Sequence, residues 1–372
     1  MLTIQKKWTP SLIFLETTRA CEYTCLHCRA VSQPEPSPDE LTIDELKSTV
    51  DEIAALDGEV PEIVLTGGNL LLKPGIRELI SHISEKKLKF SLSPAASILV
   101  DQEFINFAKE AGLNSISLSL DFPTNEGAGN LRDPKHSIEL VRNISRMAIN
   151  AGIKVQINTT VYDGNVNQLP SILKIIKDMG VSTWEVFFLI RTGRAVGLSD
   201  LSPSEYMQVN SWLSDLINYG MNVRTVEGPV FRVVKAMRSI SPEILNGPLY
   251  DHLSTETARL LGLKKTVRAA IISPQPALNR FRGTLFIGSV GNVYPSGLLT
   301  YLAGNVRTTK LKDIISEHVD LFDARHSETI SGKCGDCGFL QLCGGSRARA
   351  YTYRGDPFAS DPACLFHDPR SR

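Results

Sequence analysis

The segment EIVLTGGNLLLKPGIRELISHISEKK, residues 62–87, carries the two patterns that decide the fold of this chain. It begins with a short continuous run of apolar residues, which is typical of a strand buried on both faces of a sheet. After a turn that contains Gly67 and Gly68, apolar residues recur at the spacing of a helix. The segment therefore predicts one unit in which a strand is followed by a helix.

The same unit recurs on both sides of this segment, from residue 12 to about residue 190. The expected strands are LIFLETT (12–18), EIVLTGG (62–68), KFSLSP (89–94), SISLSLD (115–121), KVQINTTV (154–161) and TWEVFFLI (183–190). Such alternation implies a parallel sheet with right-handed crossovers. Six units are too few for the closed eight-stranded barrel. We therefore expect an α/β fold with a partial (β/α)6 TIM-like barrel and a small C-terminal cysteine-rich domain.

The pattern divides the chain into three expected regions. The barrel core would span residues 1–220, a connecting or substrate region of irregular pattern residues 221–282, and the cysteine-rich domain residues 283–372. Long irregular connections often form lids or substrate walls, although packing and surface exposure are the simpler interpretation of single polar residues there. Those residues include Arg232, His252, Arg280 and Arg282.

Charge and hydropathy exclude several classes of protein. The 372 residues contain 40 Lys and Arg and 40 Asp and Glu, so no excess of positive charge favours nucleic acid binding. The N-terminal segment lacks the apolar run of a signal peptide, and no segment approaches the ~20 apolar residues of a membrane span. We therefore expect a soluble cytoplasmic protein, in which clustered cysteines bind metal or do redox chemistry more often than they form disulfides.

The seven cysteines fall into two groups near the two ends of the chain. The groups are Cys21, Cys25 and Cys28 in TTRACEYTCLHCRA (17–30), and Cys334, Cys337, Cys343 and Cys364. Groups of three and four cannot pair off internally without a leftover, so both groups favour metal binding. Three thiolates are one too few to close a structural zinc site, and a cluster held by three keeps a position open for a small molecule.

The first cysteine group comes directly after the first expected strand, at the edge where parallel α/β folds place their chemistry. The same edge receives TGGN (66–69), whose glycines would let the backbone approach a ligand closely. A tight turn is the commoner interpretation of a Gly-Gly pair. This pair points to a ligand site only because it shares an edge of the sheet with the cysteines. Asp121 after the fourth strand and Asn158 in the fifth lie towards this edge as well.

With this three-then-two spacing and His27 as the aromatic residue before the last cysteine, CEYTCLHC resembles the radical S-adenosylmethionine superfamily. The resemblance implies a [4Fe–4S] cluster on Cys21, Cys25 and Cys28. Its open iron would be chelated by the amino and carboxylate groups of S-adenosylmethionine (SAM), and one electron would cleave SAM to a 5′-deoxyadenosyl radical. The alternative, a three-cysteine zinc site, does not predict the Gly-Gly turn.

The resemblance also implies which residues contact SAM. Gly67 and Gly68 match the family's Gly-Gly-Glu turn at the amino end of the cofactor, whereas Asn69 departs from its acidic residue. That change is harmless if the contact runs through the backbone, and it weakens SAM binding if the carboxylate is needed. Asp121 matches a position near the ribose, with a helix N-cap or turn as its alternative. The remaining expected contacts are His27, Ser119, Asn158 and Arg191.

The second cysteine group, spaced by two, five and twenty residues, resembles the auxiliary-cluster domains called SPASM and twitch. Ser296 stands where the full version has a further cysteine, so the resemblance implies one fully ligated auxiliary [4Fe–4S] cluster with an electron-transfer role. A structural zinc is the alternative, because ligand type alone does not decide between them. Arg347 and Arg349 beside Cys343 would compensate the charge of the cluster or, less simply, bind a substrate carboxylate.

The whole chain looks most similar to haem b synthases of the sirohaem-derived pathway and to enzymes of haem d1 synthesis, through VYPSGLL, LAGNVR and CGGSRARAY. This resemblance implies that two propionates of Fe-coproporphyrin III become vinyl groups, with an electron donor such as ferredoxin or flavodoxin. The alternatives are removal of other tetrapyrrole side chains and maturation of a ribosomal peptide. The early first strand leaves no room for a peptide-clasping domain. A non-enzymatic iron–sulfur electron carrier is a third class of function, and the three-cysteine motif argues against it.

Overall fold

The computed structural model describes residues 8–128, 131–262, 283–323 and 329–366. Arg280 and Arg282 of the sequence analysis lie outside the described residues. The described strands form one sheet in the order β10-β9-β8-β1-β2-β3-β4-β5-β6-β7. Their bounds are β1 Leu12–Glu16, β2 Glu62–Thr66, β3 Phe90–Leu92, β4 Ser115–Ser119, β5 Lys154–Val161, β6 Thr183–Phe188, β7 Asn222–Val226, β8 Thr284–Ile287, β9 Asn292–Tyr294 and β10 Gly304–Asn305.

All six predicted strands are present, as β1 to β6, and neighbours pair in parallel in chain order. The structure therefore confirms the α/β fold with a partial TIM-like barrel. It also extends the parallel sheet beyond the prediction, since β7 pairs with β6 and β8 pairs with β1. The sheet ends at β7 and at the short antiparallel β9–β10 pair, so the barrel is open.

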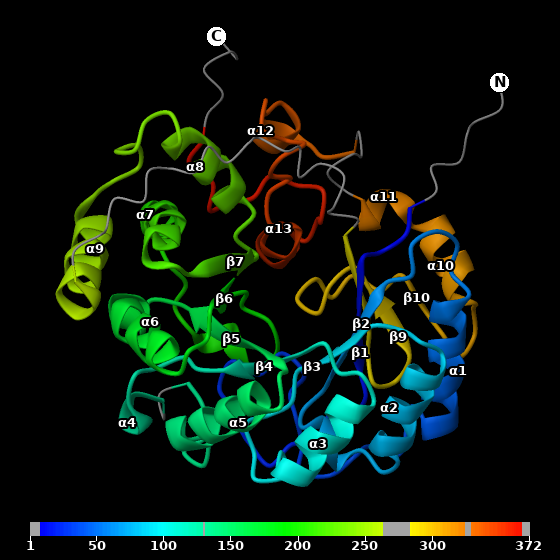
Figure 1. Cartoon of the computed structure of the whole chain (residues 1–372). Helices are drawn as coiled ribbons and strands as arrows, with labels where there is room; N and C mark the ends of the chain where they lie inside the picture. The colour runs from blue at the N-terminus through cyan, green and yellow to red at the C-terminus, as the bar shows by residue number, and fades with distance from the viewer. Residues whose placement is uncertain (1–7, 129–130, 263–282, 324–328, 367–372) are drawn as a thin grey trace.

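Helices cover the outer face of the strands (Figure 1). Helices of the barrel region are α1 Ile43–Ala54, α2 Ile76–Glu85, α3 Gln102–Glu110, α4 Asn125–Ala128, α5 Ile138–Asn150, α6 Leu169–Asp178 and α7 Pro203–Asp215. Those that follow are α8 Val230–Arg238, α9 Pro248–Leu261, α10 Leu311–Glu317, α11 Val319–Phe322, α12 Gly332–Gly335 and α13 Arg347–Arg354. Among the described helices, none combines the length and the hydrophobicity that a membrane span needs.

Local sequence explains where the longer helices begin. Thr42 and Glu45 form a capping box at α1, and Ser202 and Glu205 form one at α7. Such a box satisfies backbone N–H groups that the first turn leaves without partners. On α2, the residues at helical spacing are buried against the sheet: Ile76, Leu79, Ile80 and Ile83. The amphipathic pattern read from residues 62–87 is therefore the packing face of α2.

The inner face of the sheet is more polar than continuous apolar strands predict. Along β2, Ile63 and Leu65 are fully buried in the core, whereas the alternate residues Glu62, Val64 and Thr66 are only half-buried. The serines of β4 at positions 115, 117 and 119 repeat this alternation. Since side chains of a strand alternate between its faces, the inner surface is built from polar residues. This face is therefore not a second apolar core.

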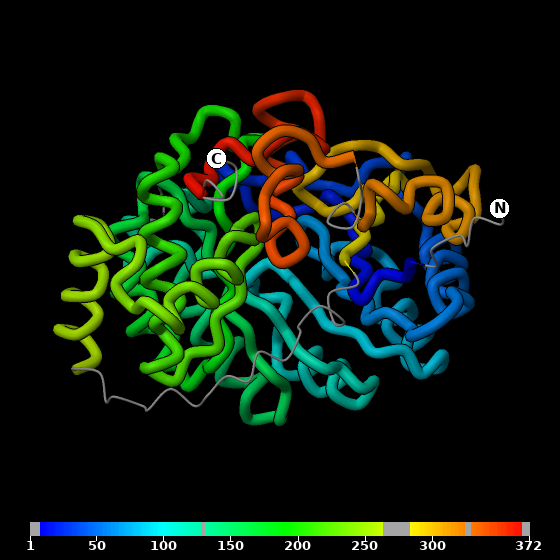
Figure 2. The backbone as a smooth tube through the Cα atoms, turned by 90° about the horizontal axis from the view of Figure 1, so that it is seen from above, coloured from blue at the N-terminus to red at the C-terminus, as the bar shows by residue number. Residues whose placement is uncertain are grey.

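The C-terminal region is joined to the first strand of the barrel. Through β8, a segment of the region expected at 283–372 continues the barrel sheet beside β1. Figure 1 shows α13 between β7 and β1. In the view turned by 90°, C-terminal segments in orange and red again lie beside the blue N-terminal segment (Figure 2).

Candidate functional site

The first cysteine loop begins after β1 and is held by neighbouring loops rather than by a helix. The Cys21 N–H donates to the Gln33 carbonyl at 2.8 Å. From the loop after β6, the Arg194 guanidinium donates to the Cys25 carbonyl at 2.8 Å and to the carbonyl and hydroxyl of Ser32, each at 3.0 Å. The Arg194 N–H also donates to the Cys28 carbonyl at 3.1 Å. One arginine thus braces the segment that carries Cys25 and Cys28.

Gly67 and Gly68 lie directly against the backbone that leads into this loop. A Cβ on Gly67 would lie 2.6 Å from the Thr18 carbonyl oxygen, and one on Gly68 would lie 2.2 Å from the Ala20 carbonyl oxygen. The Gly68 N–H donates to the Thr18 carbonyl at 2.8 Å. The glycines therefore allow the close approach of two segments of the chain itself. Their contact with SAM stays a prediction.

Asn69 connects the turn to the cysteine loop through its side chain. Its amide nitrogen donates to both carboxylate oxygens of Glu22, at 2.9 and 3.0 Å. Its N–H donates to the Ala20 carbonyl at 2.6 Å, and its side-chain oxygen accepts from the Leu71 N–H at 3.3 Å. Asn69 is 0% exposed. The Asn69 amide thus binds the carboxylate of Glu22, the residue that follows Cys21 directly.

Asp121 is buried at the end of β4, and both of its oxygens have protein partners. One accepts from Arg132 and the other from the Thr160 N–H at 2.6 Å. Burial by itself would raise the pKa of Asp121, but the Arg132 guanidinium holds that pKa below its usual value. His27 lies close by, and burial, reinforced by the Arg132 charge, lowers its pKa to about 4. Around neutral pH, His27 is therefore an uncharged ring beside a buried ion pair.

Ser119, Asn158 and Arg191 do not share one environment. Ser119 and Asn158 are register partners on β4 and β5, and both are half-buried. The Asn158 side-chain oxygen accepts from the Gln156 amide at 2.8 Å. Arg191 is exposed, and its guanidinium donates to the Val196 carbonyl at 3.2 and 3.1 Å. The structure brings the first two together on the inner face and holds the arginine within its own loop.

Sequence reasoning missed the residues that hold the site in place. Arg29 forms an ion pair with the buried Glu16 of β1 at 2.5 Å, and its guanidinium carbon lies 4.2 Å from the centre of the Phe286 ring on β8. Arg194 could have been found from its position after the sixth strand, on the same edge as the cysteines. The ion-pair partners of Arg29 and Arg132 lie 13 and 11 positions earlier, across a loop that has no regular period, so the sequence carries no signal for these pairs.

The second cysteine group surrounds one pocket at the C-terminal end. All four cysteines line it, together with the apolar residues Val233, Phe339, Leu340 and Phe366. Three of the sulfurs accept backbone N–H groups at 3.4 Å: Cys334 from Asp361, Cys337 from Phe339 and Cys343 from Gly345. Burial raises the pKa of Cys343 to about 12 and that of Cys364 to about 11. A thiolate in this pocket therefore requires a positive partner.

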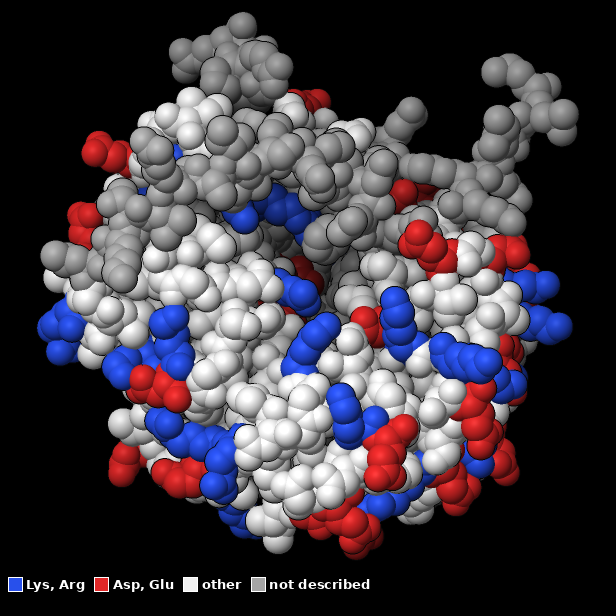
Figure 3. Space-filling view, in the orientation of Figure 1, with Lys and Arg blue, Asp and Glu red and all other residues white. Residues whose placement is uncertain are grey.

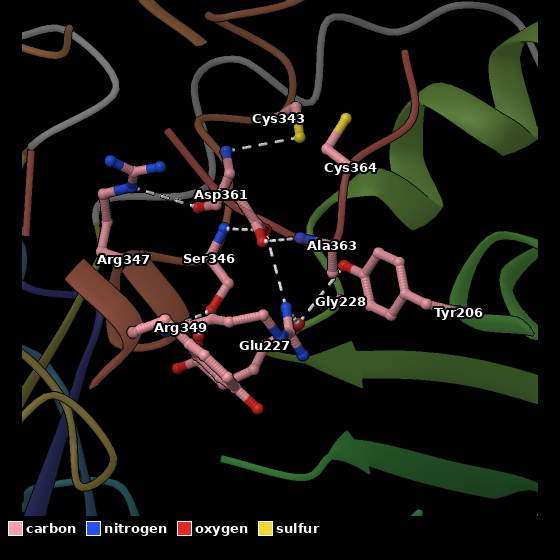
Figure 4. A network of polar contacts seen from close by, with 12 residues as sticks. Tyr206, Glu227, Gly228, Cys343, Ser346, Arg347, Arg349, Asp361, Ala363 and Cys364 are labelled. Atoms are coloured by element: carbon pink, nitrogen blue, oxygen red, sulfur yellow. Dashed lines mark hydrogen bonds and ion pairs between the residues drawn. The ribbon is translucent and has the colours of Figure 1, made fainter. Parts of the chain in front are cut away.

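Arg349 lies under this pocket in a buried network that reaches the end of β7 (Figure 4). It is 2% exposed, and its guanidinium forms ion pairs with Asp361 at 3.6 Å and Asp200 at 3.7 Å. It also donates to the Glu227 carbonyl at 3.1 Å and lies over the Tyr206 ring. Arg349 is thus paired with carboxylates of the chain itself, and its part in compensating the charge of a cluster stays a prediction.

The other arginines singled out in the sequence bind backbone carbonyls. The Arg347 guanidinium donates to the carbonyls of Pro357 and Ala359, at 2.9 and 2.7 Å. Arg232 of α8 donates to the Leu342 carbonyl at 3.4 Å, and His252 of α9 is exposed. Arg232 and Arg347 thereby hold the loops around the second cysteine group.

All seven cysteines are free of disulfide bonds. Within the described ranges, no three His, Cys, Asp or Glu side chains converge closely enough to hold a single metal ion. The four sulfurs of the second group nevertheless line a common pocket.

Four similarities connect the chain with known proteins. The family model described as Radical SAM superfamily matches residues 15–176. An AdoMet-dependent heme synthase of Nitratidesulfovibrio vulgaris is 33% identical over 97% of this chain and 94% of the relative. A pre-heme d1 synthase of Dinoroseobacter shibae is 25% identical over 95% of this chain and 85% of the relative. The crystal structure of Streptococcus suis SuiB with S-adenosylmethionine has a TM-score of 0.67 at 15% identity, covering 96% of this chain and 77% of that one, which shows likeness of fold.

Proposed function

Because this chain belongs to the radical SAM superfamily, we propose that it is a radical SAM enzyme of haem biosynthesis that converts two propionates of Fe-coproporphyrin III into vinyl groups. The observation that carries this proposal is the 33% identity to an AdoMet-dependent heme synthase over 97% of the chain. Family membership confirms the resemblance drawn from CEYTCLHC and TGGN. It also implies a [4Fe–4S] cluster and SAM as cofactors.

The first cysteine loop fits a cluster held by three thiolates. Cys21, Cys25 and Cys28 lie in one loop after β1, and Arg194 holds the carbonyls of the latter two. Burial raises the pKa of Cys21 to about 12, so a thiolate there needs the positive charge that cluster iron supplies. These three residues would hold the first cluster, and the turn at Gly67 to Asn69 lies beside it.

For the second cysteine group we propose a cluster rather than a zinc ion. Cys334, Cys337, Cys343 and Cys364 line one pocket together with apolar residues and Lys333. The solved structures that share this fold include SuiB with S-adenosylmethionine, which supports the likeness to auxiliary-cluster domains. Backbone N–H groups that point at three of the sulfurs would tune the potential of a cluster.

The reaction would divide between the cofactors and the chain. When bound, the first cluster and SAM supply a 5′-deoxyadenosyl radical that abstracts hydrogen from the β-carbon of a propionate. Loss of carbon dioxide and one electron from that propionate leaves a vinyl group. A second cluster on the C-terminal cysteines would supply an electron acceptor. The chain's own part is to hold the cysteine loop through Arg194 and Arg29 and to bind the substrate within the open barrel.

The interior of the open barrel supports a substrate with polar groups. Figure 3 shows a hollow at the centre of the molecule, with Lys and Arg as well as Asp and Glu side chains beside it. The polar inner face of β2 and β4 borders the interior of the barrel. A tetrapyrrole with several carboxylates can form hydrogen bonds and ion pairs in such a lining, which a wholly apolar ligand cannot.

The test is an anaerobic incubation of the reconstituted protein with dithionite, SAM and Fe-coproporphyrin III. Mass spectrometry would follow 5′-deoxyadenosine and the porphyrin together. We expect loss of two carboxyl groups with formation of two vinyl groups. The matched control is Cys28→Ala, which should form neither product.

Each other outcome identifies the part that is wrong. If 5′-deoxyadenosine forms and the porphyrin stays unchanged, the radical chemistry stands and the substrate is another tetrapyrrole or a peptide. If neither product forms in protein that carries its clusters, the proposed function is wrong. If a Cys334→Ala variant still completes both decarboxylations, the second site has no role in electron transfer.

A further inference from the structure

The cysteine loop holds a carboxylate beside the first candidate cluster. Glu22 follows Cys21 directly, and both of its oxygens accept hydrogen bonds from one amide nitrogen of Asn69, at 2.9 and 3.0 Å. Asn69 is fully buried, and its backbone is tied to the Ala20 carbonyl at 2.6 Å. The carboxylate is therefore fixed between the loop and the end of β2.

This carboxylate, which is half-buried, differs in its partners from the buried acids around the loop. Glu16 pairs with Arg29, Glu40 with Lys73 and Asp121 with Arg132. Within the ranges that the structure describes, no Lys, Arg or His forms an ion pair with Glu22. A carboxylate that is fixed next to three sulfur ligands and has no cationic partner there favours the binding of a cationic ligand.

We propose that Glu22 binds the ammonium group of SAM and that Asn69 positions the Glu22 carboxylate for this contact. A ligand on the open iron of the first cluster would lie between the cysteine loop and the turn after β2, where this carboxylate is held. Position 69 on the turn is an uncharged amide in this chain. The site then keeps a negative charge, because Glu22 on the cysteine loop carries it. The inference rests on the proposed function only through the binding of SAM at the first cluster.

The test measures binding in the absence of turnover. Wild-type protein and Glu22→Gln would be loaded with clusters, kept oxidised, and equilibrated by dialysis with SAM, S-adenosylhomocysteine or 5′-methylthioadenosine. Only the first two ligands carry the ammonium group. We expect Glu22→Gln to bind both of them about 10- to 100-fold more weakly, as for loss of a charged hydrogen bond. Its affinity for 5′-methylthioadenosine should be unchanged.

Two further variants separate this role from others. Glu35→Gln removes an equal charge from an exposed position beyond the loop and should bind all three ligands as wild type does. Asn69→Ala releases the carboxylate without changing the loop sequence, and should weaken SAM and S-adenosylhomocysteine selectively. It keeps the test informative if Glu22→Gln loses its cluster, which an iron and sulfide assay would show.

The inference is overturned if Glu22→Gln binds SAM as wild type does, or if it loses affinity for all three ligands equally. The second result would make Glu22 a structural residue of the loop. Failure of cluster-loaded wild-type protein to bind SAM would overturn the proposed function itself. Wild-type protein that binds SAM but leaves Fe-coproporphyrin III unchanged would refute the substrate and leave this inference standing.

Discussion

Replacing Gly68 by alanine should release the first cysteine loop. The added Cβ would lie 2.2 Å from the Ala20 carbonyl oxygen and 2.8 Å from the Arg19 carbonyl oxygen, both of them backbone atoms. Neither can withdraw without breaking a hydrogen bond, because the Ala20 carbonyl accepts from the Asn69 N–H and the Arg19 carbonyl accepts from the Gln33 N–H. Overpacking with loss of two such bonds should cost about 2–5 kcal/mol.

The cost falls on the loop that carries the three cysteines, so the effect should be local. Gly68→Ala should lose the first cluster and keep the second, which lowers the content from about eight to about four iron atoms per chain. Iron and sulfide assays with electron paramagnetic resonance of the reduced protein would distinguish the two sites. Binding of SAM should be lost together with the first cluster.

Gly197→Ala is the matched control, because nothing lies within 4 Å of an added Cβ there and its φ is not positive. It should keep both clusters and the melting temperature of wild type. If Gly68→Ala also keeps both clusters and binds SAM normally, the backbone contact does not hold the cysteine loop. The account of the glycine turn would then be wrong.

Three further changes test other parts of the structure. Arg194→Ala removes the bonds to the Cys25 carbonyl and to Ser32, each worth about 1.5–3 kcal/mol for a charged donor. The first cluster should therefore be lost to an iron chelator at least about tenfold faster, as followed by its visible absorbance. Burial lowers the pKa of His136 to about 4. Stability should thus fall by about 3 kcal/mol as pH drops from about 6.5 to about 4, and His136→Phe should flatten that slope in denaturant unfolding. Arg349→Met leaves buried carboxyl groups without their cation and should cost about 3–5 kcal/mol in the same assay.

For each of these three variants, one result would contradict the structural explanation. An Arg194→Ala protein with wild-type cluster lifetime would show that other contacts hold the loop. The sign for His136 follows from a folded pKa below the unfolded one, so the stabilising neutral form is lost as pH falls. An unchanged pH slope in His136→Phe would assign the acid sensitivity to other groups. An Arg349→Met protein of normal stability would mean that the neighbouring carboxyl groups are neutral in the fold.

The barrel and both cysteine groups could be predicted because their signals lie in consecutive residues. Each strand of β1 to β6 carries its buried apolar residues within a few consecutive positions, and each following helix repeats at its own period within about a dozen residues. The CEYTCLHC spacing is likewise a local pattern, and its position after β1 follows from the parallel topology. Family and fold therefore came from the sequence by itself.

The partners of the site residues were decided only by the tertiary structure. Glu22 meets an amide 47 positions away on the turn after β2, and Arg194 reaches a carbonyl 169 positions earlier in the chain. The sequence suggested that Gly67 and Gly68 make room for a ligand. In the structure they make room for the backbone at Thr18 and Ala20, which passes too close for a Cβ. Such pairings depend on how strand ends and loops converge in space. That convergence is a property of the whole packed sheet, so no stretch of neighbouring residues encodes it.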